Sequence, residues 1–236
     1  MKIIGVITAR SGSKAIPNKN IRNLGGIPLL GWSLKALSRS KLIEKIIFSS
    51  DSDSYFEIAH SINSDIIFHK RDTELAEDVP SELVLLDIIK KFKNFFDDDS
   101  LIVLIQPTTP FLSGKNIDEC INKLLNNSAA NTCVSVKKVE EYPEWIISLK
   151  NVNTDTGLCN NITGNVGIRK NLSKRYIPNG GIYAIRKSFL ESKQKIIDNE
   201  TIIYEMPKLN SIDIDDEEDF IICESLIKAG LFSLSE

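Results

Sequence analysis

The sequence has little of what marks membrane, secreted or nucleic-acid-binding proteins. No stretch approaches the roughly 20 consecutive apolar residues that span a bilayer, and the opening segment MKIIGVITAR has too short an apolar run for a signal peptide. The formal net charge of −3 over 236 residues gives no general attraction for nucleic acid or an anionic membrane. We therefore expect a cytoplasmic protein without membrane or nucleic-acid partners, in which any anion site is local.

Cysteine and histidine are scarce and scattered. No two of the four cysteines are in C-x-x-C spacing, and there are only two histidines. Zinc sites and redox motifs usually place such ligands at short spacings. We therefore expect buried free thiols at the four positions Cys120, Cys133, Cys159 and Cys223.

Short apolar runs alternate with amphipathic stretches through the first half of the chain, which is typical of βαβ units. Strands are predicted at 2–7, 45–49, 65–68, 101–105 and 132–136, and helices at 29–39, 54–62, 82–95 and 116–126. Because crossovers between parallel strands are right-handed, helices should cover both faces of the sheet. The sequence thus predicts a three-layer α/β/α fold with a mainly parallel, twisted sheet.

The pattern changes after residue 136. Residues 137–171 are polar and show no clean period, so we expect an insertion into one domain formed by residues 1–136 and 172–236. In the remainder, strands are predicted at 181–185, 201–205 and 211–215, and helices at 187–192 and 217–227. The chain contains no repeat and no low-complexity tract.

A group of cations follows the first predicted strand, in the stretch TARSGSKAIPNKN. Arg10, Lys14 and Lys19 supply positive charge, and the backbone N–H groups around Gly12 can form an anion nest that a ligand approaches closely. The stretch lacks the Gly-Lys-Ser/Thr of a Walker A loop and the glycine pattern of a dinucleotide fingerprint. Residue types alone therefore indicate either a phosphate site or a solvated basic loop.

Two acidic patterns are candidate metal sites. In SIDIDDEEDF, alternation predicts Asp213 and Asp215 on one face of a strand, roughly 7 Å apart, where they could hold one hard cation together with phosphate oxygens and water. The alternative is a helix start capped by Asp215 or Asp216, which leaves Asp213 unexplained. The run 97–99 contains a D-x-D, by which many glycosyltransferases hold a metal-bound sugar nucleotide, but a solvated turn is expected there.

Three further polar residues lie beside predicted strands: Asp51 and Gln106 follow strands, at the carboxyl ends where open α/β sheets bind ligands, and Asn179 precedes one. Asp51 could cap the following helix or contact a ligand, and Gln106 could face a base or sugar or tie its own turn together. Asn179, before two glycines, is equally compatible with simple turn chemistry.

Taken together, the motifs resemble those of a known family. ARSGSKAIPNKN resembles the N-terminal signature of the CMP-sialic acid synthetases (acylneuraminate cytidylyltransferases), which read roughly A-R-x-x-S-K-x-x-x-x-K-N. KRDTELAED, LIQPTTPF, YIPNGGIYAI and SIDIDDEEDF resemble later blocks of that family in the same order. The resemblance implies a sheet of the nucleotide-diphosphosugar transferase type. It also implies a nucleotidyltransferase that uses Mg²⁺ to couple CTP to a nine-carbon α-keto acid sugar, giving CMP-sugar and pyrophosphate.

The resemblance further implies roles for individual residues. The catalytic set would be Arg10, Lys14, Lys19, Asp213 and Asp215, of which the acidic pair would hold the metal. The nucleotide-binding set would be Arg10, Ser11, Gly12, Ser13, Lys14, Lys19, Asn20, Arg71 and Ser81. The sugar-binding set would be Gln106, Arg169, Lys170, Tyr176, Asn179 and Tyr183. The insertion 137–171 corresponds to the family's dimerisation element, so a homodimer is implied, with Arg169 in reach of the neighbouring subunit's pocket.

The chain departs from the family pattern on the sugar side. The usual R-Q-x-L-P is the run RKNLS at 169–173, the usual arginine after the Q-P-T block is Leu112, and Asn-Gly-Ala has become Asn-Gly-Gly at 179–181. The acceptor therefore stays open among N-acetylneuraminate, legionaminate and pseudaminate. The rival functions are a glycosyltransferase that uses Asp97 and Asp99 and a catalytically silent nucleotide-binding module.

Overall fold

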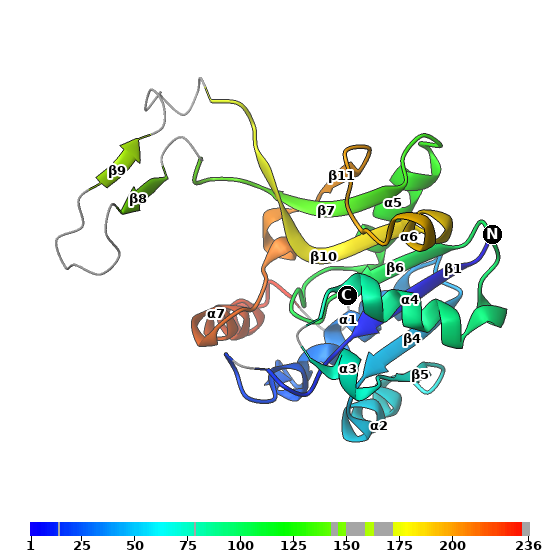
Figure 1. Cartoon of the computed structure of the whole chain (residues 1–236). Helices are drawn as coiled ribbons and strands as arrows, with labels where there is room; N and C mark the ends of the chain where they lie inside the picture. The colour runs from blue at the N-terminus through cyan, green and yellow to red at the C-terminus, as the bar shows by residue number, and fades with distance from the viewer. Residues whose placement is uncertain (14, 78, 143–145, 150–158, 163–171, 233–236) are drawn as a thin grey trace.

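A seven-stranded sheet, in the order β11-β7-β10-β6-β1-β4-β5, forms the centre of the protein (Figure 1). The structure is a computed structural model that describes residues 1–13, 15–77, 79–142, 146–149, 159–162 and 172–232. The strands are β1 (Ile3–Thr8), β4 (Lys45–Ser50), β5 (Ile67–Lys70), β6 (Leu101–Ile105), β7 (Thr132–Lys138), β10 (Tyr176–Arg186) and β11 (Ile202–Glu205). Only the two pairings of β10 are antiparallel, which confirms the predicted mainly parallel sheet.

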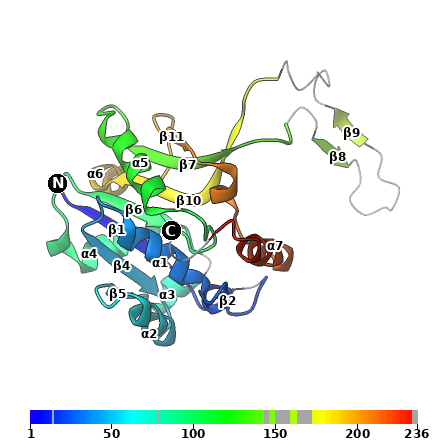
Figure 2. The ribbon, with the colours of Figure 1, turned by 180° about the vertical axis from the view of Figure 1, so that it is seen from behind.

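Helices cover both faces of this sheet. Along β1, Ile3 and Ile7 face one core cluster while Ile4 and Val6 face another, because successive side chains of a strand point to opposite faces. The first cluster is covered by α1 (Leu29–Arg39), α2 (Asp53–Ile62) and α5 (Gly114–Leu125), and the second by α4 (Ser81–Lys91) and α6 (Lys187–Lys193). Figures 1 and 2 show the two layers from opposite sides. The predicted three-layer α/β/α fold is confirmed.

A third apolar cluster joins the two ends of the chain. It packs Trp32 of α1 and Phe111 against Phe220 of α7 (Glu217–Lys228), and the Trp32 indole N–H donates to the Leu24 carbonyl at 2.9 Å. Leu24 belongs to a short hairpin formed by β2 (Asn23–Leu24) and β3 (Ile27–Pro28). The segment after β1 and the last helix are thus packed together.

Several predicted boundaries are wrong. The helix predicted at 82–95 ends at Lys91, and a separate 3₁₀ turn, Lys93–Phe95, follows it. β10 is longer than predicted and has a bulge between Pro178 and Tyr183. The predicted strand at 211–215 does not form: a 3₁₀ helix, Lys208–Ser211, leads into a segment outside the described sheets.

An arm, defined as residues 140–174 and described at 140–142, 146–149, 159–162 and 172–174, is inserted between β7 and β10. The ladder between these strands closes with a bond from Val139 N to the Arg175 carbonyl at 2.9 Å. Beyond it, β8 (Ile147–Leu149) and β9 (Cys159–Ile162) pair in a separate two-stranded sheet that lies away from the central one (Figure 1). Much of the predicted insertion 137–171, including Arg169 and Lys170, lies outside the described residues.

The expected free thiols are found at three positions. Cys120, Cys133 and Cys223 are buried and unpaired, which confirms the prediction for them; the Cys159 side chain lies outside the description. Among the described helices, none combines the length and apolar character needed to cross a membrane.

Candidate active site

The cationic loop after β1 is held in place by residues from two other segments. Ser11 donates both its backbone N–H, at 2.8 Å, and its hydroxyl to the carboxylate of Asp51, which follows β4. Burial acts to raise the pKa of Asp51, but these bonds from Ser11 outweigh it and hold the pKa below its ordinary value. The N-cap of α2 is Ser52, so Asp51 does not cap that helix and instead fixes the loop.

Asn20 closes the loop from its other end. Its side chain is buried, and its amide nitrogen donates to the Arg10 carbonyl at 3.0 Å. Asn18 takes a left-handed backbone conformation (φ 54°), which turns the chain into the 3₁₀ helix Lys19–Ile21. The loop therefore presents Arg10 and Lys19 from a fixed backbone.

The acidic segment near the end of the chain is bonded to this loop. Lys19 Nζ donates to the Ile214 carbonyl at 2.8 Å, and the guanidinium of Arg22 makes two bonds to Glu217 while lying 4.0 Å from the centre of the Phe220 ring. Ile214 is fully buried, and its N–H donates to the Thr108 carbonyl at 2.8 Å. Ile214 is thus buried and anchored between Asp213 and Asp215. This arrangement accounts for the alternation of apolar and acidic residues from which a strand was predicted.

The alternative of a helix start is confirmed for Asp216, one of the two caps that it named. Asp216 is the N-cap of α7 and forms a capping box with Asp219, accepting from the Asp219 N–H at 3.0 Å. Asp213 and Asp215 are not needed for that cap. Both line a cleft instead.

This cleft, of about 490 Å³, opens at the carboxyl ends of β1 and β6, where the fold class binds ligands. Nine residues predicted from the sequence line it: Arg10, Ser13, Lys19, Asn20, Arg71, Ser81, Gln106, Asp213 and Asp215. Six others were not predicted: Thr8, Ala15, Glu77, Val79, Pro107 and Thr108. The available signals were position for Thr8, which directly follows a predicted strand, and the blocks LIQPTTPF for Pro107 and Thr108 and KRDTELAED for Glu77; Val79 gave none.

Arg71 is a buried cation on the wall of the cleft. Its Nε–H donates to the Ser49 hydroxyl at 2.9 Å and one terminal nitrogen donates to the Ser49 carbonyl at 3.3 Å. Burial lowers the pKa of Arg71 to about 10, while the charge of Asp51 acts to raise it and the charge of Arg10 to lower it. With a pKa of about 10, the group is still charged at neutral pH. Within the described structure no carboxylate lies within ion-pair distance of Arg71, which suits it to receive an anionic ligand.

Asp213 carries an unsatisfied charge. Its Oδ1 is buried and, within the described structure, has no hydrogen-bond partner. Burial raises the pKa of Asp213 and the charge of Asp215 raises it further, although a hydrogen bond from Thr108 and the charge of Lys19 act against them. A buried carboxylate oxygen without a partner is costly. The pair therefore fits a hard cation bound between carboxylate oxygens.

Glycine at position 180 leaves the space beside this carboxylate open. Gly180 has φ +72°, and a Cβ there would lie 3.0 Å from Gln106 Oε1 and 3.2 Å from Asp213 Oδ2. Asn179 supports the turn: its side-chain oxygen accepts from Ser135 and from the Gly181 N–H, and its amide nitrogen donates to Ser211. Asn179 is buried and absent from the cleft lining, so the sugar contact predicted for it has no support in this geometry.

The two predicted tyrosines lie outside the cleft. Tyr183 lines a neighbouring hollow of about 240 Å³ that shares Ser81 and Gln106 with the cleft, and burial raises the pKa of its hydroxyl. Tyr176 lies at the root of the arm, where a hydrogen bond to Glu205 raises its pKa. Of the remaining predicted residues, Ser11 and Gly12 shape the loop without lining the cleft, and Lys14, Arg169 and Lys170 lie outside the described residues.

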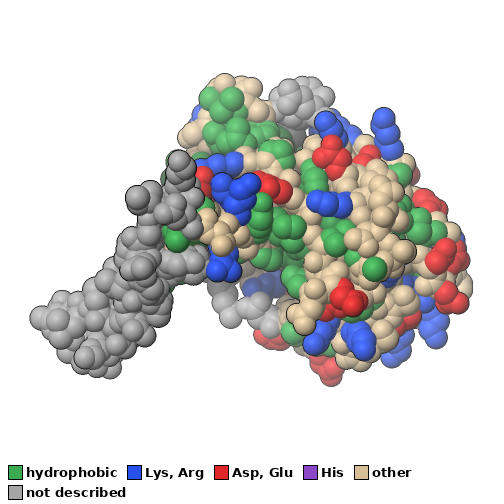
Figure 3. Space-filling view, turned by 90° about the horizontal axis from the view of Figure 1, so that it is seen from above, with side chains coloured by type: hydrophobic (Ala, Val, Ile, Leu, Met, Phe, Trp, Pro, Cys, Tyr) green, Lys and Arg blue, Asp and Glu red, His purple; other side chains and the backbone are tan. Residues whose placement is uncertain are grey.

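A larger hollow, of about 850 Å³, lies at the root of the arm. Lys137, Lys138 and Lys208 line it together with Glu140 and Glu205, and Lys208 pairs with Glu140 at 2.7 Å. From above, cationic and acidic side chains gather beside the arm (Figure 3). Because these opposite charges offset one another locally, the smaller cleft, with its separated cations and acids, is the better candidate for chemistry.

The D-x-D run is far from the cleft. It precedes β6, whereas the cleft lies at the carboxyl end of that strand. Asp97 pairs with Lys2 at 3.0 Å and Asp99 with the N-terminal amine at 3.4 Å, and both are exposed. The expected solvated turn is confirmed.

Comparisons with known proteins agree with this geometry. A family model described as cytidylyltransferase matches residues 4–225. An N-acylneuraminate cytidylyltransferase of Streptococcus agalactiae is 31% identical over 94% of this chain and 52% of the relative, so the chain spans about half that protein's length. A CMP-N,N'-diacetyllegionaminic acid synthase of Legionella pneumophila is 29% identical over 97% of both chains.

A solved structure extends the comparison to the fold. CMP:2-keto-3-deoxy-manno-octonic acid synthetase complexed with CTP superposes with a TM-score of 0.70 over 98% of this chain and 100% of that chain, at 13% identity. At this identity the likeness bears on the fold alone.

Proposed function

The chain belongs to the cytidylyltransferase family, and from that premise we propose that it transfers CMP from CTP to the anomeric hydroxyl of a nine-carbon α-keto acid sugar. The hydroxyl oxygen attacks the α-phosphorus in line, a new P–O bond forms, and the bond to pyrophosphate breaks. The products are a CMP-sugar and pyrophosphate. Such a reaction asks the protein mainly to position the reactants and to stabilise charge.

The observation that carries the proposal is the division of charge in the cleft. Arg10, Lys19 and Arg71 line it together with the acidic pair Asp213 and Asp215. The bond from Lys19 to the Ile214 carbonyl fixes the cationic side relative to the acidic side. A nucleoside triphosphate with a hard cation is the ligand class that satisfies both sides at once.

The cations would hold the phosphates. Arg71 has guanidinium N–H groups beyond the two that bind Ser49, and Arg10 and Lys19 are presented from a loop fixed by Asp51 and Asn20. Fixed donors stabilise charge that develops on the reacting phosphate without having to reorganise. Arg10 and Lys19 would therefore act on binding and on the transition state, and Arg71 on binding.

We assign a Mg²⁺ site to Asp213 and Asp215. The partnerless Oδ1 of Asp213 and the space left by Gly180 fit a cation there. Among the described residues no group of three or more His, Cys, Asp or Glu side chains is placed to hold a metal, so phosphate oxygens and water would complete the shell. When bound, Mg²⁺ would withdraw charge from the phosphates.

For the acceptor we propose a sialic-acid-type sugar. The names of the two relatives specify an N-acylneuraminate and an N,N'-diacetyllegionaminic acid, which supports this class and leaves the substituents on the sugar open, pseudaminate included. Gln106 lines both the cleft and the Tyr183 hollow, and we propose that it contacts the sugar.

We also propose a homodimer built on the arm. The hollow at its root, with Lys137, Lys138 and Ile177 at the ends of β7 and β10, offers a surface for a second copy. In such a dimer Arg169 and Lys170 of one subunit would reach the sugar carboxylate in the other.

The glycosyltransferase alternative loses its metal site, because Asp97 and Asp99 are at the opposite end of β6 from the cleft. A silent nucleotide-binding module is separated from an enzyme by assay. We expect pyrophosphate release from CTP with at least one member of a panel of N-acetylneuraminate, legionaminate and pseudaminate, and a CMP-sugar by mass spectrometry. CTP binding without release for the whole panel would contradict the proposal.

The metal assignment has its own test. Asp215→Ala should abolish pyrophosphate release while CTP binding, measured by calorimetry, survives in part on the cations. Undiminished turnover in that variant would remove Asp215 from the metal site.

A further inference from the structure

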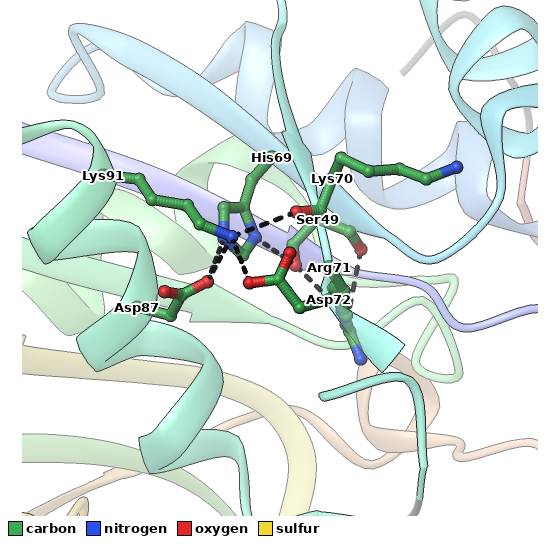
Figure 4. A network of polar contacts seen from close by, with 7 residues as sticks. All are labelled: Ser49, His69, Lys70, Arg71, Asp72, Asp87 and Lys91. Carbon is green, nitrogen blue, oxygen red and sulfur yellow. Dashed lines mark hydrogen bonds and ion pairs between the residues drawn. The ribbon is translucent and has the colours of Figure 1, made fainter. Parts of the chain in front are cut away.

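A buried polar network lies behind the cleft and ends on Arg71 (Figure 4). Ser49 is fully buried in β4, His69 is 1% exposed in β5, and Asp87 belongs to α4. None of the three lines the cleft, yet Ser49 holds two nitrogens of the Arg71 guanidinium. The network is therefore in contact with a cleft cation without contact with the cleft itself.

The fold sets this geometry through strand register. Ser49 and His69 are register partners in the parallel pair β4 and β5, which brings the Ser49 hydroxyl to 2.9 Å from His69 Nδ1. On the other side of the ring, His69 Nε2 lies 2.8 Å from Asp87 Oδ2. A continuous line of contacts thus runs from Asp87 through His69 and Ser49 to Arg71.

Counting hydrogens fixes the proton on the ring. Arg71 Nε can only donate, so the Ser49 oxygen accepts from it and its single hydrogen is left for His69 Nδ1. Nδ1 then accepts, and the ring proton is on Nε2, directed at the Asp87 carboxylate. A second ring proton on Nδ1 would leave the Ser49 hydroxyl hydrogen without an acceptor among the described residues.

The surroundings agree with a neutral ring. Burial lowers the pKa of His69, outweighing the opposing effect of Asp87, and the charges of Lys91 and Arg71 act in the same direction as burial. Lys91 donates to Asp87 at 2.9 Å and to Asp72 at 2.9 Å, so the outer end of the network is anchored on the surface (Figure 4).

The order Ser, His, Asp is also that of a hydrolase triad, but the arrangement cannot work as one. A nucleophilic serine must face its substrate. Ser49 is fully buried, and both its hydroxyl and its carbonyl are occupied by Arg71. The side of Ser49 where a substrate would react is filled by an arginine.

We propose that Asp87, His69 and Ser49 form a hydrogen-bonded relay that orients Arg71 toward the nucleotide. The three are positioning residues, because they act through Arg71. The kinetic consequence of the relay rests on the proposed function, whereas the relay itself does not.

The first test observes the relay without any reaction. Nitrogen-15 NMR of the two histidines, assigned with His60→Gln, should show His69 neutral with its proton on Nε2 at pH 7.5. The Arg71 Nε–H, assigned with Arg71→Lys, should exchange slowly with water in the wild type and faster in Asp87→Ala. A proton on Nδ1, an imidazolium at that pH, or unchanged exchange would overturn the proposal.

The second test uses kinetics of the complete protein. Asp87→Ala should raise the KM for CTP about tenfold, because a shifted guanidinium misplaces its contact, while kcat changes less than about twofold. Asp87→Asn keeps an acceptor for the Nε2 proton and should stay within about threefold of the wild-type KM. His60→Gln, on the exposed side of α2, is the matched control and should leave both constants unchanged.

A double-mutant cycle separates orientation from general damage. In an Arg71→Ala background, Asp87→Ala should add nothing to the loss of CTP affinity measured by calorimetry. An equal further loss there would mean that Asp87 acts by another route.

If the wild type neither binds CTP nor releases pyrophosphate, the proposed function fails, whereas the NMR result still decides the relay. The tests use Asp87 variants and no Ser49 variant, because the Asp87 side chain is 16% exposed whereas Ser49 is fully buried.

Discussion

At the scale of single residues, the cleft holds groups that would be unfavourable in an ordinary core. Arg71 is buried with no carboxylate within ion-pair distance among the described residues, and Asp213 has a buried oxygen that has no hydrogen bond there. Proteins keep such groups where a ligand satisfies them. Under the proposed function, both side chains lower the stability of the free protein and bind the ligand or its metal ion.

Asp213→Asn tests this trade. The variant should lose at least about 100-fold in turnover, the scale of removing one preorganised charged group. It should also melt at a higher temperature than the wild type at pH 7 without ligand, because it removes a buried charge. Asp216→Asn makes the same chemical change at a helix cap, where asparagine serves as well as aspartate, and should alter neither property.

The stability difference should depend on pH with a definite sign. The pKa of Asp213 in the folded protein lies above its ordinary value of 3.8, so the folded state takes up a proton first as pH falls. The wild type is therefore less stable than Asp213→Asn by the full amount when the pH is above the pKa of Asp213 in the folded protein. This difference in stability disappears as the pH falls through that pKa to 3.8. Melting curves of wild type and Asp213→Asn that stay equally far apart from pH 7 to pH 4 would contradict this assignment.

Gly180 offers a second test at this scale. Gly180→Ala places a side chain at φ +72° and 3.2 Å from Asp213 Oδ2, so it should cost roughly 1–2 kcal/mol of stability and lower turnover by at least about tenfold. Gly230→Ala has the same strain, at φ +74°, with nothing within 4 Å of the added carbon. It should show a similar fall in stability by chemical denaturation with normal turnover, and equal losses of turnover would refute the crowding argument.

At the scale of elements, the site depends on contacts between the loop after β1 and the segment leading into α7. The Arg22 guanidinium bonds to Glu217 and stacks on Phe220, and Lys19 bonds to the Ile214 carbonyl. The helix thus fixes the loop that presents the cations.

Charge reversal tests this contact. Arg22→Glu should raise the KM for CTP by less than about fivefold, because an exposed ion pair contributes little, and the effect should shrink in high salt. The double variant Arg22→Glu with Glu217→Arg should recover most of the loss. Faster amide exchange at residues 19–24 in the single variant would show that the loop has loosened there. If the double variant does not recover the wild-type KM for CTP, the ion pair of Arg22 and Glu217 does not hold the loop.

The sequence allowed most of the elements to be predicted but fewer of their contacts. α1 and β6 were predicted with their observed bounds, because apolar periodicity and short apolar runs report directly on burial. The strand at 211–215 failed because alternation shows which residues are buried, not whether the backbone pairs with a neighbour. The bond between Ser11 and Asp51, 40 residues apart, and the network of His69 depend on strand register and could not be read from spacing.

At the scale of the whole molecule, one sheet serves two regions. β10 runs from the root of the arm, at Tyr176, through the turn at Gly180 beside Asp213, and into the core between β6 and β7. The arm and the acidic pair are thus connected by one strand (Figure 1).

Deletion of the arm tests whether it forms the subunit interface and contributes to turnover of the sugar. Replacing residues 140–174 with a two-residue Asn-Gly turn should preserve folding, because the Val139–Arg175 bond ends the β7–β10 ladder at that point. We expect a monomer by sedimentation equilibrium that binds CTP normally and turns over sugar poorly. A dimer of unchanged affinity would place the subunit interface elsewhere.

The bond from Lys19 to the Ile214 carbonyl also bears on how the protein is made. It joins residues 195 positions apart, as does the pair of Arg22 and Glu217, and contacts of such separation form only after a long loop has closed. A chain leaving the ribosome presents its cationic loop long before the acidic segment has been synthesised. The two sides of the cleft can therefore meet only after the segment that carries Asp213 and Asp215 has been synthesised.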